Sequence, residues 1–357
     1  MIPQAKKWVS AWLAIGLILV FVQVVIGGIT RLTDSGLSIT EWELVKGVIP
    51  PLNEDAWNIA FEKYQTHAKK QFETIHQSMT MSEFKTIYFW EWFHRLWARS
   101  MGLIFFFPFV FFVYKKWLPS WLIKRLGVVI ALAALAATFG WIMVASGLNE
   151  DNRTWVSAYK LASHLLIATA LFTYLFYTFL KVYLEGKRKY EAPALKRLIL
   201  VFISVCVMQI MLGGFMAGMR AGAIHPSWPI FLGNNHLLKI VSDPSLIQES
   251  EILNYEGSVW IKGVVQILHR VFAGLLLLLA FYLPFKINKL GVQLNRSSYL
   301  VLLLVLLQYL LGVLTIISIV GNKTPVNLGV MHQGLALLVL ASLFYIYYQV
   351  NGTRKAE

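Results

Sequence analysis

Four histidines recur in register within long apolar segments of the sequence, and their spacing indicates metal chemistry. His94 and His164 lie in the first half of the chain, and His269 and His332 lie in the second half. One histidine in such a segment is usually a core side chain bonded to a carbonyl, but two per half, duplicated, favour paired ligands. Imidazole pairs on facing apolar helices are typical axial ligands of haem iron. The sequence therefore predicts two haem sites, one in each half.

Arginines accompany these histidines. Arg95 and Arg270 each follow a histidine directly, and Arg99 lies one helical turn beyond Arg95. A guanidinium group matches a carboxylate, so these side chains could bind the propionates of a haem. The alternative, arginines that extend toward lipid head groups, is equally compatible with each residue taken singly.

The two halves differ at one carboxylate. Glu91 precedes His94 by three residues and shares its helix face, whereas Gln266 holds the equivalent place before His269. One explanation is structural, because the helix dipole stabilises an acid near the start of a helix. Beside a candidate iron ligand, however, it is also a candidate catalytic group.

The elements that must position these residues are membrane-spanning helices. Hydrophobic residues make up 57% of the 357 residues, the mean hydropathy is +0.62, and the apolar residues form blocks of roughly twenty. We expect the first block to be retained, because it has no small-residue cleavage site. The predicted spans are 11–29, 86–114, 121–146, 158–183, 197–219, 259–285, 298–320 and 325–348.

The second half of the chain repeats the first. Residues 22–42 align with residues 208–228 without a gap, and the histidines of the later spans follow in the same order. Four spans per repeat is an even number, so both repeats have the same orientation. The predicted fold is an all-α integral membrane protein with two pseudo-symmetric parallel four-helix bundles. The first repeat with its long outer loop is assigned to 1–190 and the second to 191–357.

Basic residues indicate the orientation. Of the 32 Lys and Arg, 17 lie on the side of the termini, together with only three of the 18 acids, which accounts for the whole net charge of +14. The positive-inside rule then places both termini in the cytoplasm, in a bacterial inner membrane. A nucleic-acid partner is not needed to explain the charge, and the single cysteine, Cys206, excludes a disulfide within the chain.

Several motifs together resemble the heme A synthase family. The first repeat contains "EWFHR" at 91–95 and the glycine-rich "VVIGGITRLTDSGLSITEW" at 24–42. The second repeat contains "LGGFMAGMRAG" at 212–222, "HR" at 269–270 and "MHQ" at 331–333. The resemblance covers nearly all of the chain, in order and in spacing.

This resemblance implies a division of labour between the repeats. His269 and His332, with Arg270, would hold a haem b cofactor. The substrate, haem o, would bind near His94 and His164. These roles come from the family and not from the spacing.

The family also implies a reaction and a catalytic residue. Glu91 would be catalytic, and Arg95 and Arg99 would hold the propionates of the substrate. The C8 methyl group of haem o would be oxidised to a formyl group, giving haem A for terminal oxidases. A haem o synthase and oxidase assembly factors are then candidate partners besides membrane lipid, and a homo-oligomer is left open.

Two alternatives remain at this point. An electron-carrying di-haem cytochrome would also need four histidines, but it gains nothing from the difference between Glu91 and Gln266. A transporter with parallel repeats usually places polar residues near the midplane, whereas here they lie at the outer ends. The chain resembles the family branch without a cysteine pair in its first outer loop, so a disulfide electron relay is excluded.

Overall fold

In a computed structural model, the described part of the chain contains eight long helices. The structure describes residues 1–357 except 42–45, 149–153, 186–189, 230–236, 249–251 and 352–357. Each long helix is long and apolar enough to cross a membrane, which confirms the prediction of an all-helical multi-pass membrane protein. The eight are α1 (Pro3–Leu32), α4 (Met81–Tyr114), α5 (Ser120–Leu148), α6 (Ala158–Tyr183), α7 (Pro193–Gly218), α10 (Val259–Lys289), α11 (Asn295–Ile317) and α12 (Val326–Val350).

Local sequence signals fix where several of these helices begin. Proline stands in the first turn of α1 and of α7, where its missing N–H has no helical partner to lose. The hydroxyl of Thr80 and the carboxylate of Glu83 form a capping box at the start of α4. Ser258 caps α10 in a similar way. These caps are polar, so α4 begins five residues before the apolar block that predicted it.

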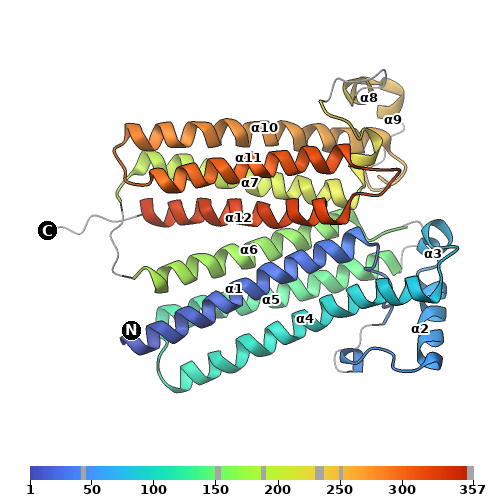
Figure 1. The fold of residues 1–357 in the computed structure, drawn as a ribbon, viewed down its shortest axis with the longest axis horizontal. Coiled ribbons are helices and arrows are strands. Elements are labelled where there is room, and N and C mark those ends of the chain that lie inside the picture. The colour runs from blue at the N-terminus through green and yellow to red at the C-terminus, as the bar shows by residue number, and fades with distance from the viewer. Residues whose placement is uncertain (42–45, 149–153, 186–189, 230–236, 249–251, 352–357) are drawn as a thin grey trace.

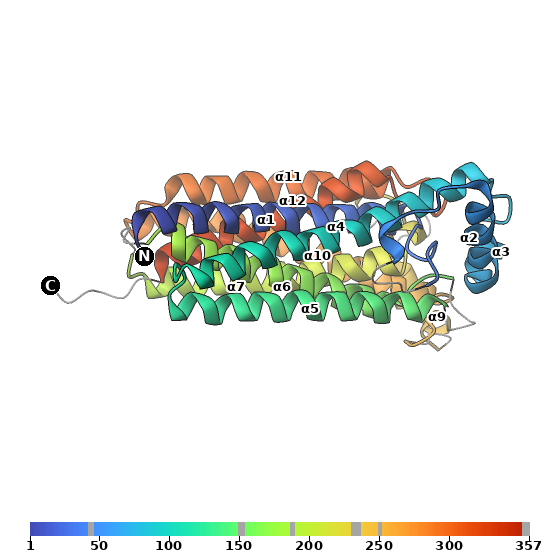
Figure 2. The same ribbon diagram turned by 90° about the horizontal axis from the view of Figure 1, so that it is seen from below.

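The helices pack in two groups that follow the sequence repeat. In the first group α1 contacts α4 and α6, and α5 contacts α6; in the second, α7 contacts α10 and α12, and α11 contacts α10 and α12. Between the groups, α6 packs on α7 and α1 on α12 (Figures 1 and 2). Each group encloses its own buried apolar cluster. The boundary at residue 190 stays a prediction.

One pair of helices differs between the groups. In the second group α10 packs along α11. Their counterparts, α4 and α5, have at most marginal contact among the described residues. The first group is therefore less closed than the second on this side.

The two repeats meet through residues at equivalent positions. Asp34 and Arg220 form a salt bridge of 2.5 Å. They are 186 residues apart, which is the offset that aligns residues 22–42 with residues 208–228. Both have a left-handed backbone, with φ of 56° and 52°. Arg31 also pairs with Asp34 and donates to the carbonyl of Ala217, its own counterpart in the second repeat, at 2.7 Å. This partly buried ionic cluster joins the loops that follow α1 and α7.

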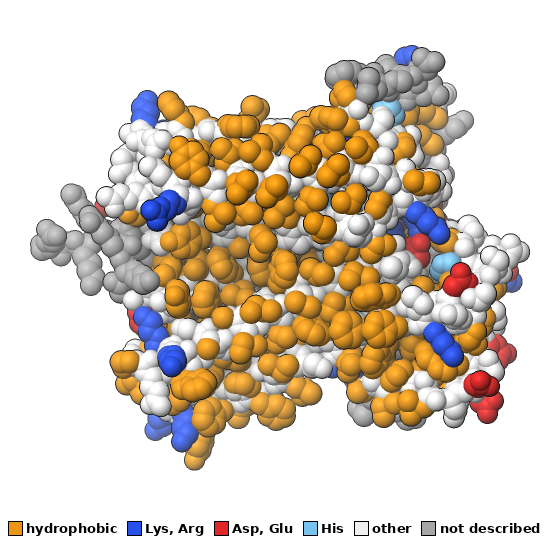
Figure 3. All heavy atoms as spheres, viewed as in Figure 1, with side chains coloured by type: hydrophobic (Ala, Val, Ile, Leu, Met, Phe, Trp, Pro, Cys, Tyr) orange, Lys and Arg blue, Asp and Glu red, His pale blue; other side chains and the backbone are white. Residues whose placement is uncertain are grey.

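The ends of the molecule differ in composition. The N-terminus and the end of α12 lie at one end, and the short helices α2 (Glu54–His67), α3 (Lys69–Ile75), α8 (Leu237–Ser242) and α9 (Pro244–Gln248) lie at the other (Figure 1). Hydrophobic side chains cover the flank between them (Figure 3). The 3-10 turns η1 (Lys46–Val48) and η2 (Ala221–Ile224) belong to the end with the short helices.

Candidate haem sites

The second pair of histidines has the geometry expected for one shared metal ion. The rings of His269 on α10 and His332 on α12 have centroids 6.3 Å apart, at 67° to each other. Two imidazoles whose nitrogens each lie about 2 Å from one metal have ring centroids roughly 6 Å apart. The Nδ1 atoms of both rings are buried without a hydrogen-bond partner among the described residues, which is rare for polar atoms that have no ligand. The two imidazoles would therefore suit a haem iron held between them.

Each of the four predicted histidines lies against a glycine on the preceding membrane-spanning helix. A methyl group added to any of these glycines would meet the Cε1 atom of the histidine ring at 3.5 Å or less. At three of them the distance is 3.0–3.1 Å, so even alanine would push the ring, whereas at Gly213 the contact would be an ordinary one. The four contacts are Gly27 with His94 at 3.1 Å, Gly140 with His164 at 3.1 Å, Gly213 with His269 at 3.5 Å, and Gly312 with His332 at 3.0 Å. The sequence repeat aligned these glycines but did not reveal their purpose.

The first pair of histidines has a similar setting. His94 on α4 and His164 on α6 lie against Gly27 of α1 and Gly140 of α5 in the same way, each with its Cε1 atom 3.1 Å from a methyl group added to the glycine. Each ring keeps some accessible surface although it points into the bundle, as do the rings of the second pair. The structure thus brings the second pair of histidines together and gives the first pair the same contacts with glycine.

Glu91 lies one turn before His94 and is almost completely buried, with 3% of its surface exposed. One carboxylate oxygen accepts hydrogen bonds from the Ser38 hydroxyl and the Ile39 N–H, both at 2.8 Å. The other oxygen pairs with Arg95 at 2.5 Å. The carboxylate therefore ties the loop after α1 to the part of α4 that carries the candidate ligand.

In the second repeat the corresponding hydrogen bond runs in the opposite direction, from the side chain on the helix to the backbone of the loop. The amide of Gln266 donates to the carbonyl of His225 at 3.0 Å, and Arg270 donates to the same carbonyl at 3.2 Å. His225 is the counterpart of Ile39 in the repeat. The loop offers donors in the first repeat and an acceptor in the second, which explains an acid in one place and an amide in the other. In addition, Nη1 of Arg270 is buried without a hydrogen-bond partner among the described residues, so it could bind an anionic group.

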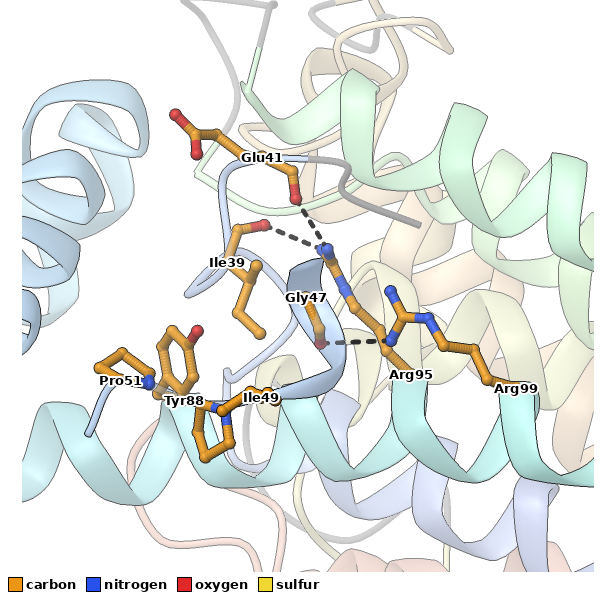
Figure 4. A pocket seen from close by; sticks show the side chains of 9 residues that line it. Ile39, Glu41, Gly47, Ile49, Pro51, Tyr88, Arg95 and Arg99 are labelled. Carbon is orange, nitrogen blue, oxygen red and sulfur yellow. Dashed lines mark hydrogen bonds between the residues drawn. The ribbon is translucent and has the colours of Figure 1, made fainter. Parts of the chain in front are cut away.

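Arg95 and Arg99 lie side by side along α4 and line a pocket of about 240 Å³ (Figure 4). Arg95 donates to the carbonyls of Ile39 and Glu41 at 2.9 and 3.0 Å. Arg99 approaches the carbonyl of Gly47 at 3.5 Å. The rest of the lining is formed by Ile49, Pro50, Pro51 and Tyr88. An apolar wall with two guanidinium groups suits the edge of an amphipathic, anionic ligand.

Glutamines are the residues near the histidines that the motifs did not single out. The side-chain amides of Gln23, Gln209 and Gln308 donate to the backbone carbonyls of His94, His269 and His332, respectively, and lie against their rings. The alignment of the repeats had paired Gln23 with Gln209, which was the only available signal.

Comparison with known proteins agrees with this arrangement. The family profile for cytochrome oxidase assembly proteins, COX15-CtaA, matches residues 10–344. A heme A synthase of Flavobacterium psychrophilum is 38% identical over 97% of this chain and 99% of its own length. Those of Flavobacterium johnsoniae and of a Bradyrhizobium species (strain ORS 278) are 36% and 37% identical over 98% and 93% of this chain, and over 99% and 88% of their own lengths. The chain therefore belongs to the heme A synthase family, as its motifs had indicated.

Proposed function

We propose that this heme A synthase binds haem o between His94 and His164 and oxidises its C8 methyl group, while His269 and His332 hold a resident haem b. The observation that carries the proposal is the pair of histidines in each repeat, with a separation in the second repeat that fits one iron. A haem bound there would supply electron transfer or oxidative chemistry that side chains cannot provide.

The chain's own residues would then orient the substrate. Arg95 and Arg99 would pair with the propionates at the pocket in Figure 4. The apolar helices around the porphyrin would exclude water from the reacting methyl group. Arg270 would serve the propionates in the second repeat through its unpaired Nη1.

Glu91 would act as the catalytic carboxylate. It is buried one turn from His94, so it could hold a proton or stabilise positive charge as the methyl group is oxidised. Its bonds to Ser38, Ile39 and Arg95 fix the direction in which the carboxylate points. No counterpart to this charge exists at Gln266.

The orientation proposed is that of a bacterial inner-membrane protein with both termini in the cytoplasm. It is supported by the 17 basic residues on the side of the termini, of which 187–189, 354 and 355 lie outside the described residues. All four histidines then lie in the outer half of the membrane. A haem o synthase must supply the substrate, and assembly of a terminal oxidase must consume the product.

The test is production of haem A in cells that supply haem o. Expression of the chain should yield extractable haem A, and His94→Ala or His164→Ala should abolish it while haem b remains. Haem b without haem A in the unaltered protein would instead support an electron-carrying cytochrome. Normal haem A in both variants would overturn the assignment of the substrate to the first repeat.

A further inference from the structure

Three of the four histidines are held by a glutamine that lies four residues before the contacting glycine. The amide nitrogens are 3.3, 3.0 and 3.0 Å from the histidine carbonyls for Gln23, Gln209 and Gln308. They also lie 3.2, 3.4 and 3.4 Å from the Nε2 atoms of the rings. Each amide therefore both tethers the helix and restricts rotation of the ring.

The fourth histidine has no such glutamine. Ala136 lies four residues before Gly140, as Gln308 lies four residues before Gly312. The two positions are also equivalent in space, because the ring of His164 interacts with the backbone carbonyl of Ala136 as that of His332 does with Gln308.

The amide oxygen gives each glutamine a second role. The Oε1 atoms of Gln23, Gln209 and Gln308 are buried without a partner among the described residues. The Nδ1 atom of His332 is also unpaired, and the amide nitrogen of Gln308 lies 3.4 Å from Nε2 of the same ring. A histidine that binds a metal through one nitrogen usually donates its other N–H to an oxygen, and loss of that partner typically costs about 10–100-fold in metal affinity or activity. A methyl group at position 136 cannot accept such a bond from His164.

We propose that the residue at this position of α5 and α11 sets how long each repeat retains its haem. Gln308 is a positioning residue that fixes His332 for a permanent cofactor. Ala136 offers His164 its backbone carbonyl but no side-chain amide, so a bond from His164 to iron would break more readily when product leaves and substrate enters. The marginal contact between α4 and α5 is consistent with a site that must open. This inference rests on the proposed assignment of substrate and cofactor to the two repeats.

The first test installs the missing glutamine. Ala136→Gln should retain haem A during purification and slow its release to an added haem acceptor by about 10-fold or more. Turnover should fall by a similar factor while KM for haem o does not rise. Ala136→Leu is the matched control, since it has similar bulk without an amide. Equal behaviour of the two variants, or release by Ala136→Gln at the unaltered rate, would overturn the proposal.

The second test removes the glutamine from the other repeat. Gln308→Ala should lose haem b to an added acceptor about 10–100-fold faster. The reduction potential of the haem b in this variant should rise, because an imidazole without an acceptor for its N–H donates less electron density to iron. Unchanged haem b retention and potential would refute the role of Gln308. Failure of haem A formation in the unaltered protein would refute the proposed function instead, and the haem b measurement would still stand.

Discussion

At the scale of single residues, Glu91 combines two roles that can be separated. Its carboxylate is buried and bonded to Ser38, Ile39 and Arg95, so it anchors the loop after α1. The equivalent position in the second repeat holds the uncharged Gln266, so the two positions differ in the negative charge of Glu91. A substitution that keeps the shape and removes the charge therefore distinguishes anchoring from catalysis.

Glu91→Gln should reduce haem A formation by about 10²–10⁴-fold if the carboxylate takes part in proton transfer. The amide oxygen can still accept from Ser38 and Ile39, so the loop should stay in place and haem b should remain at its normal amount. Both pigments are measured in one preparation by acid extraction and chromatography. Unchanged haem A would leave only the anchoring role, and loss of both pigments would show that the charge is needed for folding.

The second pair of histidines should control haem b alone. If these two imidazoles hold haem b as proposed, His269→Ala or His332→Ala removes one of them, so the haem b absorbance of the purified protein should disappear. His94→Ala is the matched control from the first repeat and should keep that absorbance. A haem b spectrum that survives both second-repeat substitutions would show that the halves are assigned the wrong way round.

At the scale of elements, α2 and α3 are joined by a small polar network outside the membrane-spanning helices. The Tyr64 hydroxyl bonds to Nδ1 of His76 at 2.5 Å and to Gln71 at 3.1 Å. The amide of Gln71 reaches the carbonyl of Asp34 at 3.5 Å. This network connects α2 and α3 to the ionic cluster between the repeats.

The attachment of α2 and α3 should weaken in acid. Burial lowers the pKa of His76 below its ordinary value, so protonation is less favourable in the folded than in the detached state. The stabilisation is therefore complete above the ordinary histidine pKa of about 6.5 and is lost as the pH falls below it. The protection factors for hydrogen exchange in 54–75, which are corrected for the intrinsic exchange rate, should fall between pH 7 and 5.

The control for this prediction is His76→Gln, which keeps a polar group but does not titrate in that range. Exchange in 54–75 should then be nearly independent of pH after correction for the intrinsic rate. An equal pH dependence in the unaltered protein and in the variant would assign the effect to another group.

The sequence predicted the elements better than their contacts. Seven of the eight spans were located to within five residues, whereas α1 begins eight residues before the predicted span. Hydropathy marks the apolar core of a helix and misses its polar ends, such as the capping box of Thr80 and Glu83. The repeat also placed the histidines in pairs. It could not show that Glu91 meets Ser38, 53 residues earlier, because hydrogen bonds between distant segments depend on the path of a loop.

At the scale of the whole molecule, the distribution of charge predicts the orientation. A reporter that is active only in the cytoplasm should be active when fused after Glu357 and silent when inserted near residue 60, in α2. The same reporter in the short connection at 115–119 is a positive control, because that connection shares the end of the termini. The reverse pattern would place all four histidines in the inner half of the membrane.

The salt bridge between Asp34 and Arg220 has an evolutionary consequence. The two residues occupy the same position of the repeat, so an ancestor built from two identical copies would have placed like charges against each other there. Opposite charges at this position can arise only after the copies have become separate stretches of sequence. Two copies of the first repeat alone would bring Asp34 against Asp34 and should repel each other. The pair of Asp34 and Arg220 therefore favours an assembly of one copy of each half over one built from two copies of the first half.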